Sequence, residues 1–160
     1  MPVAGIYVAS AVLLLVAGAQ KVVDPRPLVR ALASVRLPVP AVVVRIGAAA
    51  EVLLGLAAVV TGSRVAASAV AVSYLVFTTL VLLAIARGGV LASCGCFGKR
   101  DVPPTRTHAA VTAGFAAVAL VMSTRSAAGV VTDLPLLLAA AAVAATAYAV
   151  LAVLPLVQAR

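Results

Sequence analysis

Apolar residues fill long stretches of the chain, and short polar stretches separate them. A helix needs about 20 apolar residues to cross the hydrocarbon core of a bilayer. Five stretches approach or exceed this length, and we predict a membrane span in each: residues 3–20, 41–61, 65–86, 108–122 and 134–157. The pattern therefore predicts one integral membrane domain over residues 1–160. It is an all-α polytopic bundle of four core transmembrane helices plus a fifth at its C-terminal end.

The composition agrees with this pattern and narrows the class of protein further. The chain is 65% hydrophobic and only 10% charged, whereas soluble domains are about 45–50% apolar and about 25% charged. A net charge of +8 also occurs in nucleic-acid-binding proteins. Here, however, the basic residues cluster in loops between apolar spans, as they do in membrane proteins. We therefore expect the lipid bilayer, and no nucleic acid, as a partner.

The first span has one feature of a cleavable signal peptide, because Ala17-Gly18-Ala19 resembles a small-residue cleavage site. No basic residue precedes the span, so the positively charged region of a signal peptide is missing. We expect a retained helix.

Two of the connections are long and polar. Residues 21–40 contain four prolines and a run of small and apolar residues at helical spacing, which predicts a short interfacial helix over residues 28–37. Residues 87–107 contain both cysteines of the chain and then Pro103-Pro104, which should end any helix before the fourth span.

The distribution of basic residues predicts the orientation in the membrane. Two spans separate the two long connections, so both lie on the same side. With five spans, ten of the twelve Lys and Arg residues fall on that side, and only Arg64 and Arg125 fall on the other. The positive-inside rule then places the cysteine loop in the cytoplasm and the N-terminus outside the cell membrane.

Cys94 and Cys96 are the main candidates for chemistry. Gly95 between them tolerates the backbone angles of a very small disulfide ring. Such a disulfide is more easily reduced than a structural one, and the nearby Lys99 and Arg100 favour the thiolate. The sequence thus favours a redox pair over two unpaired thiols. A transient Cu(I) site on the two thiolates is the alternative, with His108 as a third soft ligand, although we predict no resident metal.

Glu51 is the third candidate catalytic residue, because it lies near the middle of the second span. An ionised acid there costs about 2.5–3.5 kcal/mol on insertion scales, so it should face the bundle and find a polar partner. Lys21, Arg45 and the Tyr74 hydroxyl are candidate partners. Three roles stay open for Glu51: a proton relay, a contact to a quinone head group, and a hydrogen bond that fixes helix packing.

Other polar residues have simpler interpretations. Lys21 and Asp24 are three residues apart, which predicts a local ion pair at the end of the first helix. Arg87 ends the third span, where its side chain can reach the lipid head groups. His108 begins the fourth span, and we interpret it as an interfacial histidine.

These motifs, in this order, resemble those of a known family. They are GAQKVVDP over residues 18–25, EVLLG over residues 51–55, Arg87-Gly88, and Cys94-Gly95-Cys96-Phe97-Gly98. The chain resembles the MauE branch of the MauE/DoxX group of small redox-associated membrane proteins over roughly residues 5–115. The block of Cys94, Gly95, Cys96, Phe97 and Gly98 is specific, while the other motifs are weak when taken singly.

The resemblance implies a multi-pass protein connected with methylamine utilisation. It implies a role in maturing a disulfide-rich methylamine dehydrogenase subunit, beside a thioredoxin-like partner. An exported enzyme as client would place the cysteines outside, whereas the charge distribution places them inside, and we follow the charge distribution. The alternatives to a membrane thiol–disulfide oxidoreductase are a non-catalytic membrane scaffold and a metal-delivery protein.

Overall fold

The structure, a computed structural model, is all-helical. It describes residues 2–34, 36–87, 105–125 and 134–149. Within these ranges four helices are long and apolar enough to cross a membrane. They are α1 (Pro2–Val23), α3 (Ala41–Thr61), α4 (Arg64–Ala86) and α5 (Arg106–Ser123). The shorter helices are α2 (Arg26–Ser34) and the apolar α6 (Leu134–Tyr148). The predicted fold class, with four long spans and a further C-terminal helix, is confirmed, and the chain is a multi-pass membrane protein.

A two-residue turn joins α3 to α4. Gly62 adopts a left-handed conformation with φ 55°, and its N–H donates to the Ala58 carbonyl oxygen. Glycine is the residue that enters this region without a steric penalty. Ser63 then caps α4, because its hydroxyl accepts from the Ala66 N–H at 3.1 Å. The turn is therefore closed by hydrogen bonds on both sides, and α4 must run antiparallel to α3.

The short helix predicted over residues 28–37 is present, but it begins and ends earlier, at Arg26 and Ser34. The Arg36 N–H donates to the Ala33 carbonyl at 3.0 Å, and the Leu37 N–H donates to the Leu32 carbonyl at 2.9 Å. This is the Schellman pattern that ends a helix. It puts Arg36, rather than a glycine, at a φ of 60°.

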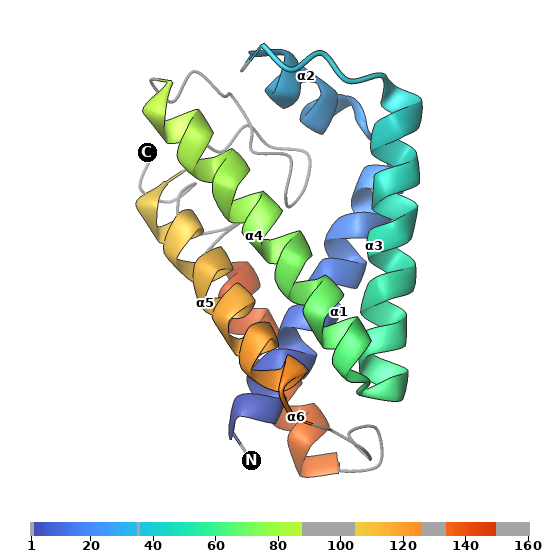
Figure 1. The fold of residues 1–160 in the computed structure, drawn as a ribbon, viewed down its shortest axis with the longest axis vertical. Coiled ribbons are helices and arrows are strands. Elements are labelled where there is room, and N and C mark those ends of the chain that lie inside the picture. The colour runs from blue at the N-terminus through green and yellow to red at the C-terminus, as the bar shows by residue number, and fades with distance from the viewer. Residues whose placement is uncertain (1, 35, 88–104, 126–133, 150–160) are drawn as a thin grey trace.

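The long helices form two antiparallel pairs, with α1 packed on α3 and α4 packed on α5. Helix α1 also packs on α5 and α6, so it joins the two pairs. Figure 1 shows α3 and α4 meeting at their common turn and diverging toward the other end of the bundle, where α2 lies. Ala31 of α2 packs there against Leu83 and Ala84 of α4. The α2 helix is thus attached to the end of the bundle.

The core lies where α1 meets α4, α5 and α6. Its largest fully buried side chains include Tyr7, Leu14 and Val70. Tyr74 of α4 packs edge-on against Phe77 and tilted against Phe115, with ring centroids 5.9 and 5.3 Å apart. Alanines fill much of the remaining core, which lets the helix backbones approach closely.

Large apolar side chains cover much of the outer surface of α3 and α4. Leu53 and Ile46 of α3, for example, are about two-thirds exposed. An outward apolar surface is what a bilayer requires, because lipid tails solvate it. The helices therefore support association with the lipid bilayer.

Candidate functional site

The cysteine segment joins α4 to α5. Cys94, Gly95, Cys96, Phe97 and Gly98 lie outside the described residues, so their predicted roles stay predictions. The described chain stops at Arg87 after α4 and resumes at Thr105 before α5. The end of α4 and the start of α5 lie at the end of the bundle that also carries α2 (Figure 1). This agrees with the prediction that the two long connections share a side.

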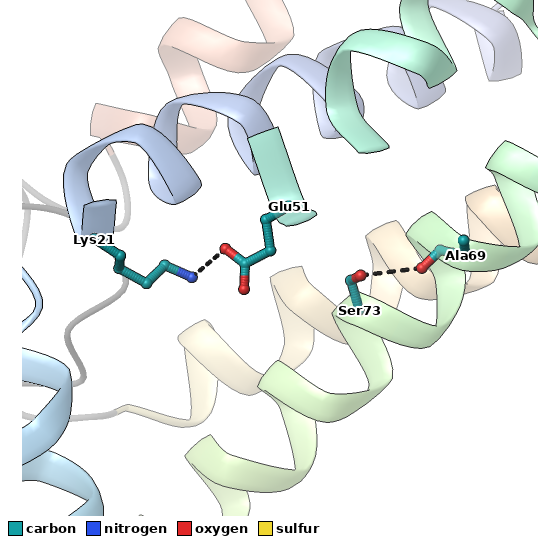
Figure 2. Close-up of polar contacts among 4 residues, drawn as sticks. All are labelled: Lys21, Glu51, Ala69 and Ser73. Carbon is teal, nitrogen blue, oxygen red and sulfur yellow. Dashed lines mark hydrogen bonds and ion pairs between the residues drawn. The ribbon is translucent and has the colours of Figure 1, made fainter. Parts of the chain in front are cut away.

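An ion pair joins α1 to α3 inside the bundle. The Lys21 ammonium and a Glu51 carboxylate oxygen are 2.5 Å apart, and the two side chains are only 5% and 18% exposed. Figure 2 shows the two groups pointing toward each other from their helices. The expectation that Glu51 faces the bundle and finds a polar partner is confirmed. Whether Glu51 also transfers protons or contacts a quinone stays a prediction.

Two neighbours define the surroundings of this pair. The Lys21 nitrogen lies 4.4 Å from the centre of the Phe77 ring of α4. An ammonium over an aromatic face gains a cation–π attraction, which is larger when both groups are shielded from water. Gly18 lies one turn before Lys21. A Cβ added to Gly18 would be 2.8 Å from the Ala48 carbonyl oxygen and 3.0 Å from the Glu51 Cβ. The missing side chain therefore lets α1 approach α3 closely enough for the ion pair to form.

The predicted ion pair between Lys21 and Asp24 is wrong. Lys21 turns into the bundle toward Glu51. Asp24 instead accepts from the Arg26 N–H at 3.2 Å and lies 3.7 Å from the Arg26 guanidinium. The physical reason is burial: a lysine inside the bundle needs an acid at its own depth. Asp24, which follows the end of α1, is half exposed and needs no such partner.

The other two candidate partners of Glu51 have different surroundings. The Tyr74 hydroxyl donates a hydrogen bond to the Ser10 carbonyl oxygen of α1 at 2.7 Å. Arg45 is exposed near the start of α3. Ser73 of α4, also drawn in Figure 2, donates to the Ala69 carbonyl of its own helix at 3.0 Å.

His108 is not at the surface, although it lies at the start of α5 as predicted. It is 2% exposed, and its N–H is capped by the Thr105 hydroxyl at 3.2 Å. The interpretation as an interfacial histidine is therefore corrected to a histidine buried at the end of the bundle. Across the described residues, no three His, Cys, Asp or Glu side chains gather as metal ligands would.

Arg87 is exposed immediately after α4, and its N–H donates to the Leu83 carbonyl at 3.1 Å. That its side chain reaches toward lipid head groups stays a prediction.

Sequence reasoning missed two contacts made by α4. One is the Phe77 ring under Lys21. The other is a hydrogen bond of 2.9 Å between the Thr78 and Thr112 hydroxyls, which joins α4 to α5. Polar side chains within the two spans were a signal for the second contact, since such groups pair across membrane helices. Nothing in the sequence indicated which helix Phe77 faces.

Comparison with known proteins identifies the family. The model of the family described as "Methylamine utilisation protein MauE" matches residues 1–125, which include all four long helices and the cysteine segment. No curated protein and no solved structure matches this chain. The matched range contains the Lys21–Glu51 ion pair and both cysteines. The chain belongs to the MauE family, which connects this multi-pass membrane protein with methylamine utilisation.

Proposed function

We propose that this protein is a membrane thiol–disulfide redox protein in which Cys94 and Cys96 alternate between dithiol and disulfide. The observation that carries the proposal is the pair itself. The only two cysteines of the chain are one residue apart, with Gly95 between them, in the connection between two spans. The family match over this region supports a place in methylamine utilisation. There we propose that the pair serves the maturation of methylamine dehydrogenase.

The proposed partner is a thioredoxin-like protein with its own cysteine pair. A thiolate of one protein attacks the disulfide of the other and forms a mixed disulfide, and one sulfur leaves as a thiolate. The second thiolate of the attacking pair then displaces the partner, so one disulfide has formed and one has broken. Two electrons and two protons pass from the dithiol of one protein to the disulfide of the other, which leaves the sum of atoms and charges unchanged.

Glu51 and Lys21 are proposed as the groups that hold a proton for this exchange. Acids buried within membrane spans are rare, pair with other polar groups, and form part of proton relays in membrane proteins. A quinone head group is the alternative ligand of Glu51. We favour the proton role because the carboxylate already binds Lys21. Asp24, Arg87, Phe97 and Gly98 are proposed only as supporting residues.

The proposed orientation places the cysteines in the cytoplasm. Lys21 no longer counts as a loop charge, because Glu51 neutralises it inside the bundle. Most of the remaining basic residues still fall on the side of the two long connections, which supports this orientation.

The redox proposal is tested by titrating the cysteine pair. The purified protein is equilibrated in graded glutathione buffers, and free thiols are alkylated and counted by mass. We expect an intramolecular disulfide that is reduced at a higher potential than a structural disulfide. A pair that stays fully reduced in strongly oxidising buffer, without metal, would refute the proposal.

Single cysteine variants separate this function from the alternatives. Cys94→Ser and Cys96→Ser should each abolish exchange with a thioredoxin-like protein, because neither remaining thiol can complete the second displacement. A scaffold predicts little effect of either change on the assembly that it supports. A metal-delivery protein predicts copper or zinc in the purified wild type, measured by elemental analysis, and loss of that metal in both variants.

The proton role of Glu51 needs a variant that removes the acid without leaving Lys21 unpaired. The double variant Lys21→Met/Glu51→Leu does this, because it removes both charges. A proton role predicts slower thiol–disulfide exchange in this variant at unchanged disulfide potential. A packing role predicts an unchanged rate.

A further inference from the structure

A group of exposed arginines surrounds the end of the bundle that carries α2. Arg26 and Arg30 lie on α2, Arg36 follows it, and Arg45 lies in the first turns of α3. Arg87 follows α4, and Arg106 begins α5. We call these six residues the arginine collar. Among the described residues at this end only Asp24 opposes them, because Lys21 and Glu51 neutralise each other.

The collar lies at the depth of the lipid head groups. Helix α3 has 21 residues, so it is about 31 Å long and matches a hydrocarbon core of about 30 Å. Its first residue, Ala41, therefore lies at one face of that core. The end of α1, the end of α4 and the start of α5 lie at the same end of the bundle as Ala41 (Figure 1). Side chains just beyond these helix ends are thus level with phosphate groups, and Arg45, about one turn inside α3, can extend its long side chain to the same level.

The α2 helix is oriented for contact with this layer. Arg26 and Arg30 are four residues apart and share its exposed face. On the other side Ala31 is buried against α4, while Leu28 and Leu32 are half-buried. The packing of Ala31 fixes α2 to the bundle, so its arginine face is held outward.

Exposed apolar residues accompany the arginines. Val23 at the end of α1 is 81% exposed, and Leu37 after α2 is 44% exposed. Water penalises such exposure, whereas the boundary between head groups and acyl chains accommodates it. This mixture of arginine and apolar side chains fits a lipid surface better than it fits a soluble anionic peptide.

We propose that the arginine collar binds anionic phospholipid head groups. The guanidinium group suits this ligand because its planar N–H groups bind phosphate oxygens in pairs. Each basic residue near an anionic leaflet changes lipid affinity by about five-fold. Anionic lipid should therefore be enriched around this end of the protein.

The absence of tryptophan from the chain allows a clean optical test. A Val23→Trp variant carries one emitter, placed three residues before α2. The full-length variant is reconstituted in phosphatidylcholine nanodiscs that contain a small fraction of either dansyl-labelled phosphatidylglycerol or dansyl-labelled phosphatidylcholine. We expect stronger energy transfer to phosphatidylglycerol, and we expect added salt to weaken this preference. Equal transfer to the two lipids would overturn the proposal.

Charge variants locate the binding surface. In the Val23→Trp background, the triple change Arg26→Gln/Arg30→Gln/Arg36→Gln should lower the preference by about five-fold for each arginine removed. The matched control Arg64→Gln/Arg125→Gln changes exposed arginines at the opposite end and should keep the preference. Loss of the preference in this control as well would show a general charge effect and overturn the proposal. The proposal would also be overturned if soluble glycerol phosphate, at the same bulk concentration as the labelled lipid, abolished the preference for phosphatidylglycerol.

Discussion

Two buried tyrosines differ in how their hydroxyl groups are bonded. The Tyr74 hydroxyl donates to the Ser10 carbonyl at 2.7 Å. The Tyr7 hydroxyl is buried with no hydrogen-bond partner among the described residues. An intramolecular hydrogen bond makes a net contribution of about 1 kcal/mol to stability. A buried hydroxyl without a partner has lost its hydrogen bonds to water and gained none in the protein.

We therefore expect opposite results from the same substitution at these two positions. Tyr74→Phe should lower the free energy of unfolding in detergent micelles by about 1 kcal/mol. Tyr7→Phe should leave it unchanged or raise it. Each variant serves as the control for the other, and equal losses in both would contradict the hydrogen-bond assignments.

The Lys21–Glu51 ion pair predicts strong coupling between its two residues. Removing one partner of a buried pair leaves an uncompensated charge and costs about 3–5 kcal/mol. Lys21→Met alone and Glu51→Leu alone should each destabilise the protein by about this much. The double variant should recover most of the loss, because apolar side chains of similar volume suit the interior of the bundle.

A double-mutant cycle in detergent micelles measures this coupling. The Phe77 ring gives a further check. Phe77→Leu should hold the Lys21 ammonium less strongly in the bundle, because it removes the cation–π contact. Additive losses in the double variant would mean that the two side chains do not interact.

The sequence predicted the depth of Glu51 but could not choose its partner. Hydropathy placed an acid inside a span, and the energetics of membrane burial then required a polar neighbour. Lys21 had two candidate acids, Asp24 by helical spacing and Glu51 by depth. The choice depends on how closely α1 approaches α3, and that distance is set by tertiary packing at Gly18.

At the scale of the helices, two glycines set the crossing of α1 and α3. An added Cβ on Gly18 would be 2.8 Å from the Ala48 carbonyl, and one on Gly55 would be 2.7 Å from the Ala11 carbonyl. Both obstacles are backbone atoms, so the helices would have to separate. Gly18→Ala and Gly55→Ala should therefore destabilise the protein and weaken the ion pair.

Two other helical glycines supply the matched controls. A Cβ on Gly47 of α3 or on Gly114 of α5 would meet nothing within 4 Å. Alanine there should be neutral, or stabilise by up to about 1 kcal/mol through its higher helix propensity. Thermal unfolding of the four variants in detergent measures the contrast. Destabilisation by Gly47→Ala as large as that by Gly18→Ala would contradict the proposed crossing.

Hydropathy was sufficient to locate the spans but not to pair them. The predicted and observed ends of the first four spans differ by at most three residues, because the length of the apolar core fixes them. The end of α2 was missed, since its terminating residue is Arg36 rather than a glycine. The pairing of α1 with α3 and of α4 with α5 depends on side-chain shape, which hydropathy does not record. The predicted fifth span, residues 134–157, is described only as far as residue 149 and begins with the helix α6.

At the scale of the whole molecule, the proposed orientation predicts which compartment can reach the cysteines. A membrane-impermeant maleimide added to intact, reduced cells should not label Cys94 or Cys96. It should label them once the membrane is opened, because the basic connections are retained in the cytoplasm. Efficient labelling in intact cells would show that the orientation is the opposite one and would favour an exported client.

Reporter cysteines in a Cys94→Ser/Cys96→Ser background control for access. Thr124→Cys lies at an exposed position after α5, and Ala33→Cys lies at an exposed position on α2. The end of α5 and the helix α2 are at opposite ends of the bundle (Figure 1). Thr124→Cys should be labelled in intact cells and Ala33→Cys only after opening. The same labelling of both would show that the assay does not report sidedness.

The pairing of α1 with α3 also has a consequence for the order in which the protein is assembled during synthesis. All contacts of that pair, including Gly18, Gly55 and the Lys21–Glu51 ion pair, are encoded within the first 61 residues. Lys21 can therefore meet its counter-charge as soon as the second long helix enters the membrane, before α4 and α5 have entered it. The first two long helices can thus form a helical hairpin whose buried charges, Lys21 and Glu51, already neutralise each other. The α4–α5 pair is added afterwards to the exposed side of α1.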